Sequence, residues 1–225
     1  MEKAINFYKL LTEQRRGSSV TRWNGTPQMY RDYNVATHAF NCANILLMLS
    51  VLQDVEPDGK LLALLLTHDN IEAFTGDLLA PAKDLLPEKW DEIENEVQQN
   101  AVRMLNAEKD EEAEFRWGIY TMFPTDEDIK RKIRTAPFLL LKLIDMYEFL
   151  NRVAEEYQAG NRHPNIIRAL KYGTDSFNKR CLQMIEELGD VQQENFYKRS
   201  TEILASSLRY FYRDAGCYNL CYADD

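Results

Sequence analysis

The 225-residue sequence contains little histidine, glycine, proline or cysteine, and it lacks a long hydrophobic run. It has three histidines, nine glycines, seven prolines and four cysteines. So few glycines and prolines, together with 45% hydrophobic and 28% charged residues, exclude a fibrous or disordered chain and are typical of a globular one. No two cysteines form a CxxC pair, which excludes a zinc ribbon and a small disulfide-framed domain. We expect four reduced thiols.

Positive charge is scarce as well. The chain has 27 Lys and Arg against 36 Asp and Glu, a net charge of −9 at pH 7. This balance excludes a protein that binds a nucleic-acid polymer, which needs a basic surface. A small phosphorylated ligand stays compatible, because it requires only a few local cations.

No segment of the sequence reads as a membrane or export signal. The first residues mix charged and apolar side chains, unlike the core of a signal peptide. The most apolar stretch, residues 61–66, is far too short to cross a bilayer. We therefore expect a cytoplasmic protein without a membrane partner, located in the host cytoplasm if the sequence is viral.

Apolar residues recur with the period of a helix, and no run alternates with the period of a strand. The pattern predicts an all-α fold, a bundle of about seven to nine helices without internal repeats. We expect one domain over residues 1–212 and a mobile tail over residues 213–225. The predicted helices cover residues 3–14, 34–53, 60–74, 88–107, 110–122, 126–134, 135–157, 164–188 and 190–212.

Two histidines and two aspartates stand in apolar helical surroundings. His68 and Asp69 interrupt the run LLALLLTHDNIEAF, and His38 lies near the start of the preceding predicted helix. Asp145 interrupts a further apolar run, LLLKLIDMYEFL. Burying such groups is costly unless they are paired or bound to a ligand. Taken singly, each is more often structural: backbone groups at a helix end can satisfy His68-Asp69, and Lys142 can pair with Asp145.

Taken together, the four residues indicate a metal site. Two of the three histidines belong to the set, and mixed ligation by imidazole and carboxylate suits one divalent transition metal ion such as Co, Mn, Fe, Ni or Zn. Four protein ligands also leave positions open for water and a substrate oxygen, as metal-assisted hydrolysis requires.

The order His38, His68-Asp69, Asp145 resembles that of the HD-domain metal-dependent phosphohydrolases, an all-helical superfamily named for its His-Asp pair. The resemblance is closest to the bacterial HD-domain 5′-deoxynucleotidases and covers roughly residues 18–150. Its most specific part is the string RW…H…HDxxExxTGDxxxPxK. Beyond His38, His68 and Asp69, this string is made up of Arg22, Trp23, Glu72, Thr75, Gly76, Asp77, Pro81 and Lys83.

The resemblance assigns roles to these positions. It implies that His38, His68, Asp69 and Asp145 hold the metal ion. It further implies catalytic or sugar-binding acids at Glu72 and Asp77, a phosphate-contacting Arg22, and a Trp23 that lies against the deoxyribose and excludes a 2′-hydroxyl. Thr75 and Lys83 join the expected substrate contacts.

The residue types support some of these roles and leave alternatives. A helix places i and i+4 on one face, so His68 and Glu72 can both face one cleft, where Glu72 can orient or deprotonate a metal-bound water. Asp77 can instead cap a short helix. Arg22 can form a bidentate contact with phosphate, although loop arginines are more commonly solvated, as lysines such as Lys83 are. Trp23 can pack into the core.

The sequence departs from the family pattern in two places. Members typically have an acid directly before the first metal-binding histidine, whereas this chain has Thr37, which leaves the orientation of His38 open. The loop between Trp23 and His38 also differs, which bears on the substrate.

We therefore predict a metal-dependent phosphohydrolase that converts deoxynucleoside 5′-monophosphates to deoxynucleoside and phosphate. One alternative is a dNTP triphosphohydrolase of the phage type, which releases triphosphate. A second alternative is a non-catalytic HD-fold regulatory or binding module, for which loss of metal ligands would be expected. The resemblance further implies a homodimer, and the partner molecule is a small deoxynucleotide.

Overall fold

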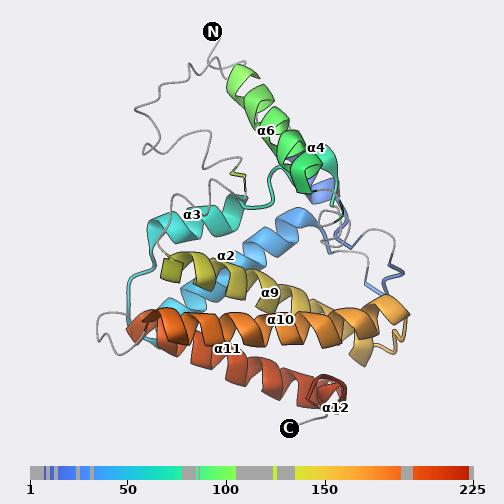
Figure 1. Ribbon diagram of the computed structural model, residues 1–225. Helices are drawn as coiled ribbons and strands as arrows, with labels where there is room; N and C mark the ends of the chain where they lie inside the picture. The colour runs from blue at the N-terminus through green and yellow to red at the C-terminus, as the bar shows by residue number, and fades with distance from the viewer. Residues whose placement is uncertain are drawn as a thin grey trace. The chain divides into compact units, whose positions relative to one another are not determined.

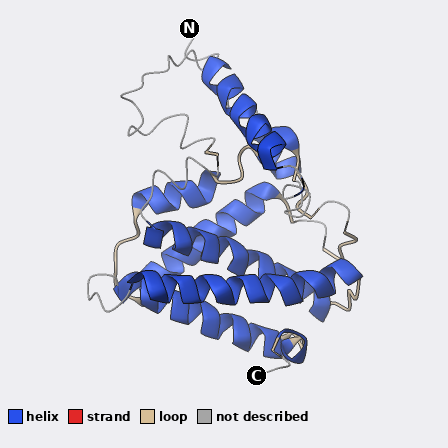
Figure 2. Cartoon of the chain, in the orientation of Figure 1, coloured by secondary structure: helices blue, strands red, loops and turns tan. Residues whose placement is uncertain are grey.

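A computed structural model describes most of the chain, and its regular elements are helices (Figures 1 and 2). The described residues are 8, 11–12, 15–23, 26–30, 33–77, 85, 87–104, 124–125, 135–188 and 195–222. Within these ranges no strand occurs, and the one β-type pairing among them is an isolated bridge between Thr21 and Asn34. The predicted all-α fold is confirmed. The predicted helices at 110–122 and 126–134, and Lys83, lie outside the described residues.

The chain divides into two compact units. The first comprises residues 1–24, 32–40 and 63–133, and the second comprises residues 25–31, 41–62 and 134–225. The single domain expected over residues 1–212 stays a prediction.

The first unit combines several short elements with one long helix. It contains the 3-10 helix η1 (Gly17–Ser19), the first turns of α2 (Val35–Leu52), the end of α3 (Gly59–Thr67), the single turn α4 (Glu72–Thr75) and α6 (Pro87–Met104). Its buried apolar side chains include those of Trp23, Tyr33, Leu64, Leu65 and Ile71. Many short elements leave many helix ends, where backbone groups and polar side chains meet.

The second unit is built from long helices. Its described elements are the rest of α2 and α3, then α9 (Thr135–Gln158), α10 (Pro164–Leu188), α11 (Asn195–Asp214) and the short α12 (Tyr218–Cys221). Helices α9, α10 and α11 lie side by side (Figure 1). The buried residues of α10 recur every three or four positions, which is the stripe of an amphipathic helix. They are Ile166, Leu170, Thr174, Phe177, Cys181, Met184 and Leu188.

The predicted boundaries of the long helices agree with the structure to within about two residues where both ends are described. The helix predicted over 34–53 is α2, the one over 135–157 is α9, and the one over 164–188 is α10. The helix predicted over 190–212 begins at Asn195 in the structure and ends at Asp214, while residues 189–194 are outside the described part.

The predicted continuous helix over 60–74 is wrong. Helix α3 ends at Thr67, a turn follows, and α4 begins at Glu72. In the turn, the Asn70 N–H donates to the Thr67 carbonyl at 2.9 Å and the Glu72 N–H donates to the Asp69 carbonyl at 2.9 Å, so the i→i+3 pattern replaces the α-helical one. Asp and Asn favour such breaks because their side chains compete for backbone groups.

Helix α2 carries no Lys, Arg, Asp or Glu, and it is the one described helix long and apolar enough by composition to cross a membrane, with a mean hydropathy of 1.6. Half of this helix is buried within the protein. A core helix of a globular protein passes the same test, so this feature does not indicate a membrane span by itself.

The end of the chain is partly helical. Helix α11 extends to Asp214, and α12 follows with buried side chains of Cys217 and Tyr222 at its edges. The mobility expected for residues 213–225 stays a prediction. All four cysteines are free thiols, as the sequence predicts.

Candidate metal and phosphate site

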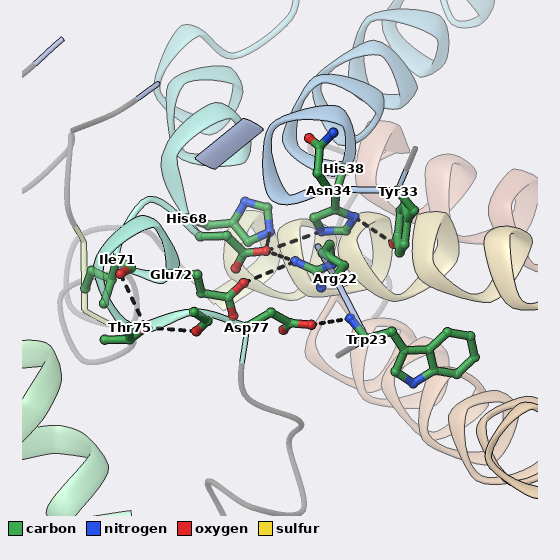
Figure 3. A network of polar contacts seen from close by, with 12 residues as sticks. Arg22, Trp23, Tyr33, Asn34, His38, His68, Ile71, Glu72, Thr75 and Asp77 are labelled. Atoms are coloured by element: carbon green, nitrogen blue, oxygen red, sulfur yellow. Dashed lines mark hydrogen bonds and ion pairs between the residues drawn. The ribbon is translucent and has the colours of Figure 1, made fainter. Parts of the chain in front are cut away.

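The break after α3 creates the centre of the candidate site. His68 is the first residue beyond the helix, Asp69 follows it in the turn, and Glu72 opens α4. His68 and Glu72 are 8% and 5% exposed, so both are buried polar residues. A continuous helix would have spread these side chains along one face, whereas the turn gathers them at one point (Figure 3).

His38 reaches the same point from the start of α2. Asn34 caps this helix, since its Oδ1 accepts the N–H of Thr37 at 2.9 Å, as Asn commonly does. The cap places His38 in the first turn, where its side chain is fully buried. The imidazole rings of His38 and His68 lie 5.3 Å apart between centroids.

Asp69 stands between the two histidines. Its Oδ2 lies 3.6 Å from Nε2 of His38 and 3.5 Å from Nε2 of His68 (Figure 3). These separations exceed a hydrogen bond. They approach the spacing of about 3–3.5 Å between neighbouring ligand atoms that each bind one metal ion at about 2.0–2.2 Å. Three potential ligand atoms thus face a common point.

The tautomer of His68 is set by the backbone. Its Nδ1 lies 2.9 Å from the carbonyl oxygen of Leu65. A carbonyl only accepts, so Nδ1 carries the proton and donates it. The lone pair is then on Nε2, the nitrogen that faces Asp69, and metal-binding histidines are commonly held in this way.

Tyr33 is the hydrogen-bond partner of His38. Its hydroxyl lies 3.3 Å from Nδ1 of His38, and the two rings meet edge to face at 89°. The hydroxyl can donate or accept; in the His38 tautomer that carries its proton on Nδ1, the hydroxyl accepts and Nε2 faces Asp69 with its lone pair. The sequence left the orientation of His38 open because Thr37 replaces the family acid, and the structure provides Tyr33, which is 2% exposed, as a partner.

Arg22 supplies the positive charge of the cluster. Its Nη1 donates to Oδ2 of Asp69 and lies 3.7 Å from Oε2 of Glu72. Its side chain is 14% exposed, and its backbone N–H donates to the Tyr33 carbonyl at 3.1 Å. The sequence prediction that Arg22 belongs to the site is consistent with this placement among the carboxylates.

Trp23 and Asp77 meet through the backbone. The N–H of Trp23 donates to Oδ2 of Asp77, while Figure 3 shows the indole extending away from that carboxylate. Trp23 has a φ of 65° and is 6% exposed, a left-handed conformation that is rare for a bulky residue. The strained turn directs the Trp23 N–H to Asp77. Asp77 follows Gly76, whose φ is 76°.

The remaining predicted residues are less closely tied to this cluster. The hydroxyl of Thr75 bonds backbone oxygens of Ile71 and Gly76. Asp145 is half-buried in α9, in the second unit, so its membership of the ligand set stays a prediction. Cys42, one turn after His38, was not predicted, yet His38, Cys42 and His68 form a buried group able to hold a metal ion.

The donor set fits a divalent transition metal. It offers two imidazole nitrogens and a carboxylate oxygen between them, the mixture that such ions accept. Sequence reasoning missed Tyr33 and Cys42. The signal for Cys42 was its i+4 spacing from His38, but Tyr33 lies before the helix cap and carries no periodic signal.

Comparison with known protein families agrees with this geometry. The sequence matches the family described as 5′-deoxynucleotidase YfbR-like over residues 6–199. A search of curated proteins finds no match. Because the family covers most of the chain, including all ten predicted site residues, the chain belongs to the YfbR-like 5′-deoxynucleotidase family and is a metal-dependent phosphoric ester hydrolase.

Proposed function

We propose that this enzyme hydrolyses deoxynucleoside 5′-monophosphates to a deoxynucleoside and phosphate. The observation that carries the proposal is the position of Asp69 Oδ2, which lies within 3.6 Å of two imidazole Nε2 atoms and beside the Arg22 guanidinium. The Asp69 carboxylate thus lies next to two potential metal ligands and next to a cation that can bind an anionic phosphate. The family match supports the reaction class.

Four residues hold the metal in this proposal: His38, His68, Asp69 and Asp145. The first three lie in one unit with their ligand atoms converging, and Asp145 completes the set. A divalent ion held there supplies an activated water and offsets the charge of the phosphate. The Leu65 carbonyl keeps His68 in the tautomer that binds through Nε2, and the Tyr33 hydroxyl is proposed to do the same for His38 by accepting from Nδ1.

Glu72 is proposed to handle the proton. Its carboxylate is buried at the start of α4 and lies near Arg22, so it can accept a proton from the attacking water and return it to the leaving 5′-oxygen. Arg22 binds the phosphate through its planar guanidinium.

The deoxyribose is proposed to lie against the turns that carry Trp23, Thr75 and Asp77. The Trp23 N–H to Asp77 bond joins the two turns, which supports one rigid surface for the sugar. Lys83 joins this set as a further phosphate contact. Asp77 is close to Glu72 in the sequence, and we propose it as the alternative donor of the proton to the leaving 5′-oxygen.

A monophosphate is preferred to a triphosphate as substrate because the matched family is described as a 5′-deoxynucleotidase. A dNTP triphosphohydrolase remains the alternative, since both reactions use the same metal ligands. We place the enzyme in the cytoplasm as a homodimer with a small deoxynucleotide as its partner, and we assign it no nucleic-acid or membrane partner.

A nucleotide panel tests the proposal. Phosphate release is measured with Mn²⁺ or Co²⁺ and equal concentrations of dNMPs, the matching rNMPs and dNTPs. We expect release of inorganic phosphate from the dNMPs, with much lower rates on the rNMPs. Triphosphate released from dNTPs would favour the alternative reaction. No turnover of any nucleotide by the metal-loaded protein would contradict the proposed function.

A further inference from the structure

We propose that Arg22 is an internal cation that occupies the Asp69 carboxylate in the metal-free enzyme and that the metal ion displaces it. The inference rests on the proposed function, since it concerns regulation of the same site. In this inference, Arg22 competes with the metal ion for Asp69 in the metal-free enzyme and binds the phosphate only after the metal ion is bound.

The first argument is that Tyr33 contacts both the backbone and the side chain of Arg22. Its backbone N–H donates to the carbonyl of Tyr33 at 3.1 Å, and its guanidinium carbon lies 5.9 Å from the centre of the Tyr33 ring. The side chain is 14% exposed. These contacts hold the guanidinium in one position and keep it largely out of solvent.

The second argument is that Arg22 uses the oxygen that the metal needs. Nη1 of Arg22 donates to Oδ2 of Asp69. The same oxygen is the one lying 3.6 Å from Nε2 of His38 and 3.5 Å from Nε2 of His68. A cation bound among these three atoms would lie within repulsive distance of the guanidinium, so both cannot hold Oδ2 in the same way.

The third argument is the balance of charge. Asp69 and Glu72 bring two carboxylates to a largely buried place, and Arg22 lies 3.7 Å from Oε2 of Glu72 as well. Without a cation, two neighbouring carboxylates repel each other and lose hydration. Arg22 therefore stabilises the metal-free protein, and the stabilisation is lost when a divalent ion takes over the same carboxylate.

The displaced guanidinium does not leave the site. Its backbone stays attached to Tyr33, so only the side chain moves, by rotation about its own bonds. Its donors are then free of Asp69 and face whichever anion the metal attracts. Metal binding thus releases the arginine to bind the phosphate. The metal ion therefore binds first and the phosphate second.

A calorimetric titration with Mn²⁺ alone, without nucleotide, tests the inference. Wild type, Arg22→Gln and Arg22→Lys are compared. We expect Arg22→Gln to bind Mn²⁺ about tenfold more tightly, the scale of one lost charge-assisted hydrogen bond, and Arg22→Lys to lie between the two. A merely structural arginine would have the opposite effect, because its loss would disorder the ligands and weaken metal binding.

Melting temperatures give a second readout. Metal-free Arg22→Gln should melt below metal-free wild type, and added Mn²⁺ should raise its melting temperature by more than that of wild type, as linkage requires. Arg152→Gln is the matched control. Arg152 is also 14% exposed, pairs with Glu155 at 3.0 Å and lies over Tyr30, but belongs to the second unit, so its affinity for Mn²⁺ should equal that of wild type.

The outcomes separate the inference from the function. Equal or weaker Mn²⁺ binding by both Arg22 variants, with normal binding by wild type, overturns the displacement and leaves the metal site intact. Absence of Mn²⁺ binding by wild type overturns both. If Arg22→Gln does not fold without metal, Arg22→Lys carries the comparison, and weaker binding than wild type by that variant overturns the inference.

Discussion

Arg22 and Arg152 show how differently the two units use the same residue. Both side chains are 14% exposed, both pair with a carboxylate and both lie near a tyrosine ring. Arg152 pairs with Glu155, one turn away on its own helix. Arg22 reaches across 47 residues of sequence to Asp69. The local pair supports a helix, whereas the long-range pair gathers charges at one place, which is what a catalytic site requires.

Neutral polar pairs extend the comparison. In the second unit, Thr174 bonds Tyr212 at 2.9 Å and Gln53 bonds Ser200 at 2.8 Å. Such pairs satisfy buried polar groups without charge. The first unit instead concentrates two carboxylates, two imidazoles and a guanidinium around one turn. The lesson is that stability is distributed along the long helices, whereas the chemistry is concentrated at helix ends.

The largest effect is expected at Glu72. Glu72→Gln removes the base and acid while keeping a side chain of the same shape, so kcat on a dNMP should fall about 10²- to 10⁴-fold. Affinity for Mn²⁺, measured by calorimetry, should change little because Glu72 is not a proposed ligand.

The matched control is Glu94→Gln. Glu94 is also a buried glutamate of the first unit, but it accepts the Trp90 indole N–H at 2.7 Å in α6. Its variant should retain kcat. If Glu72→Gln and Glu94→Gln have the same turnover, Glu72 has no part in proton transfer.

A smaller effect is expected at Tyr33. Tyr33→Phe removes the hydroxyl that is hydrogen-bonded to Nδ1 of His38, so affinity for Mn²⁺ should fall about tenfold, at the lower end for partners of metal-binding histidines. Tyr147→Phe removes a hydroxyl that bonds Ser207 at 2.6 Å in the second unit and should leave metal affinity unchanged. An unaltered dissociation constant for Tyr33→Phe would show that His38 is oriented by another group.

The smallest effect is expected on stability alone, at Gly173. A Cβ there would lie 2.8 Å from Cδ2 of Leu150, which is fully buried. The destabilisation by overpacking, about 1–3 kcal/mol, outweighs the stabilisation of about 1 kcal/mol expected from the higher helix propensity of Ala. Gly173→Ala should therefore lower the urea midpoint without changing metal affinity.

Gly59→Ala is its control, since nothing lies within 4 Å of the added carbon. The control should be neutral or slightly stabilising. If Gly173→Ala weakens metal binding more than Tyr33→Phe does, the division of stability and chemistry between the units is wrong.

The sequence predicts the long helices well because their apolar periodicity extends over many turns. It also identifies His38, His68 and Asp69, since polar residues inside apolar runs are conspicuous. It does not predict the break between Thr67 and Glu72, because the apolar pattern continues across it while local bonds of Asp69 and Asn70 end the helix. Contacts between distant segments, such as Tyr33 with Arg22 or Trp23 with Asp77, leave no periodic trace.

Metal-dependent release of phosphate from a deoxynucleoside monophosphate tests the central claim most directly. The rate on dAMP is measured for protein stripped with a chelator and again after one equivalent of Mn²⁺ or Co²⁺ is restored. The account predicts no release from the stripped protein, recovery on metal addition, and no recovery for Asp69→Asn. Equal phosphate release with and without metal, or full recovery by Asp69→Asn, would contradict it.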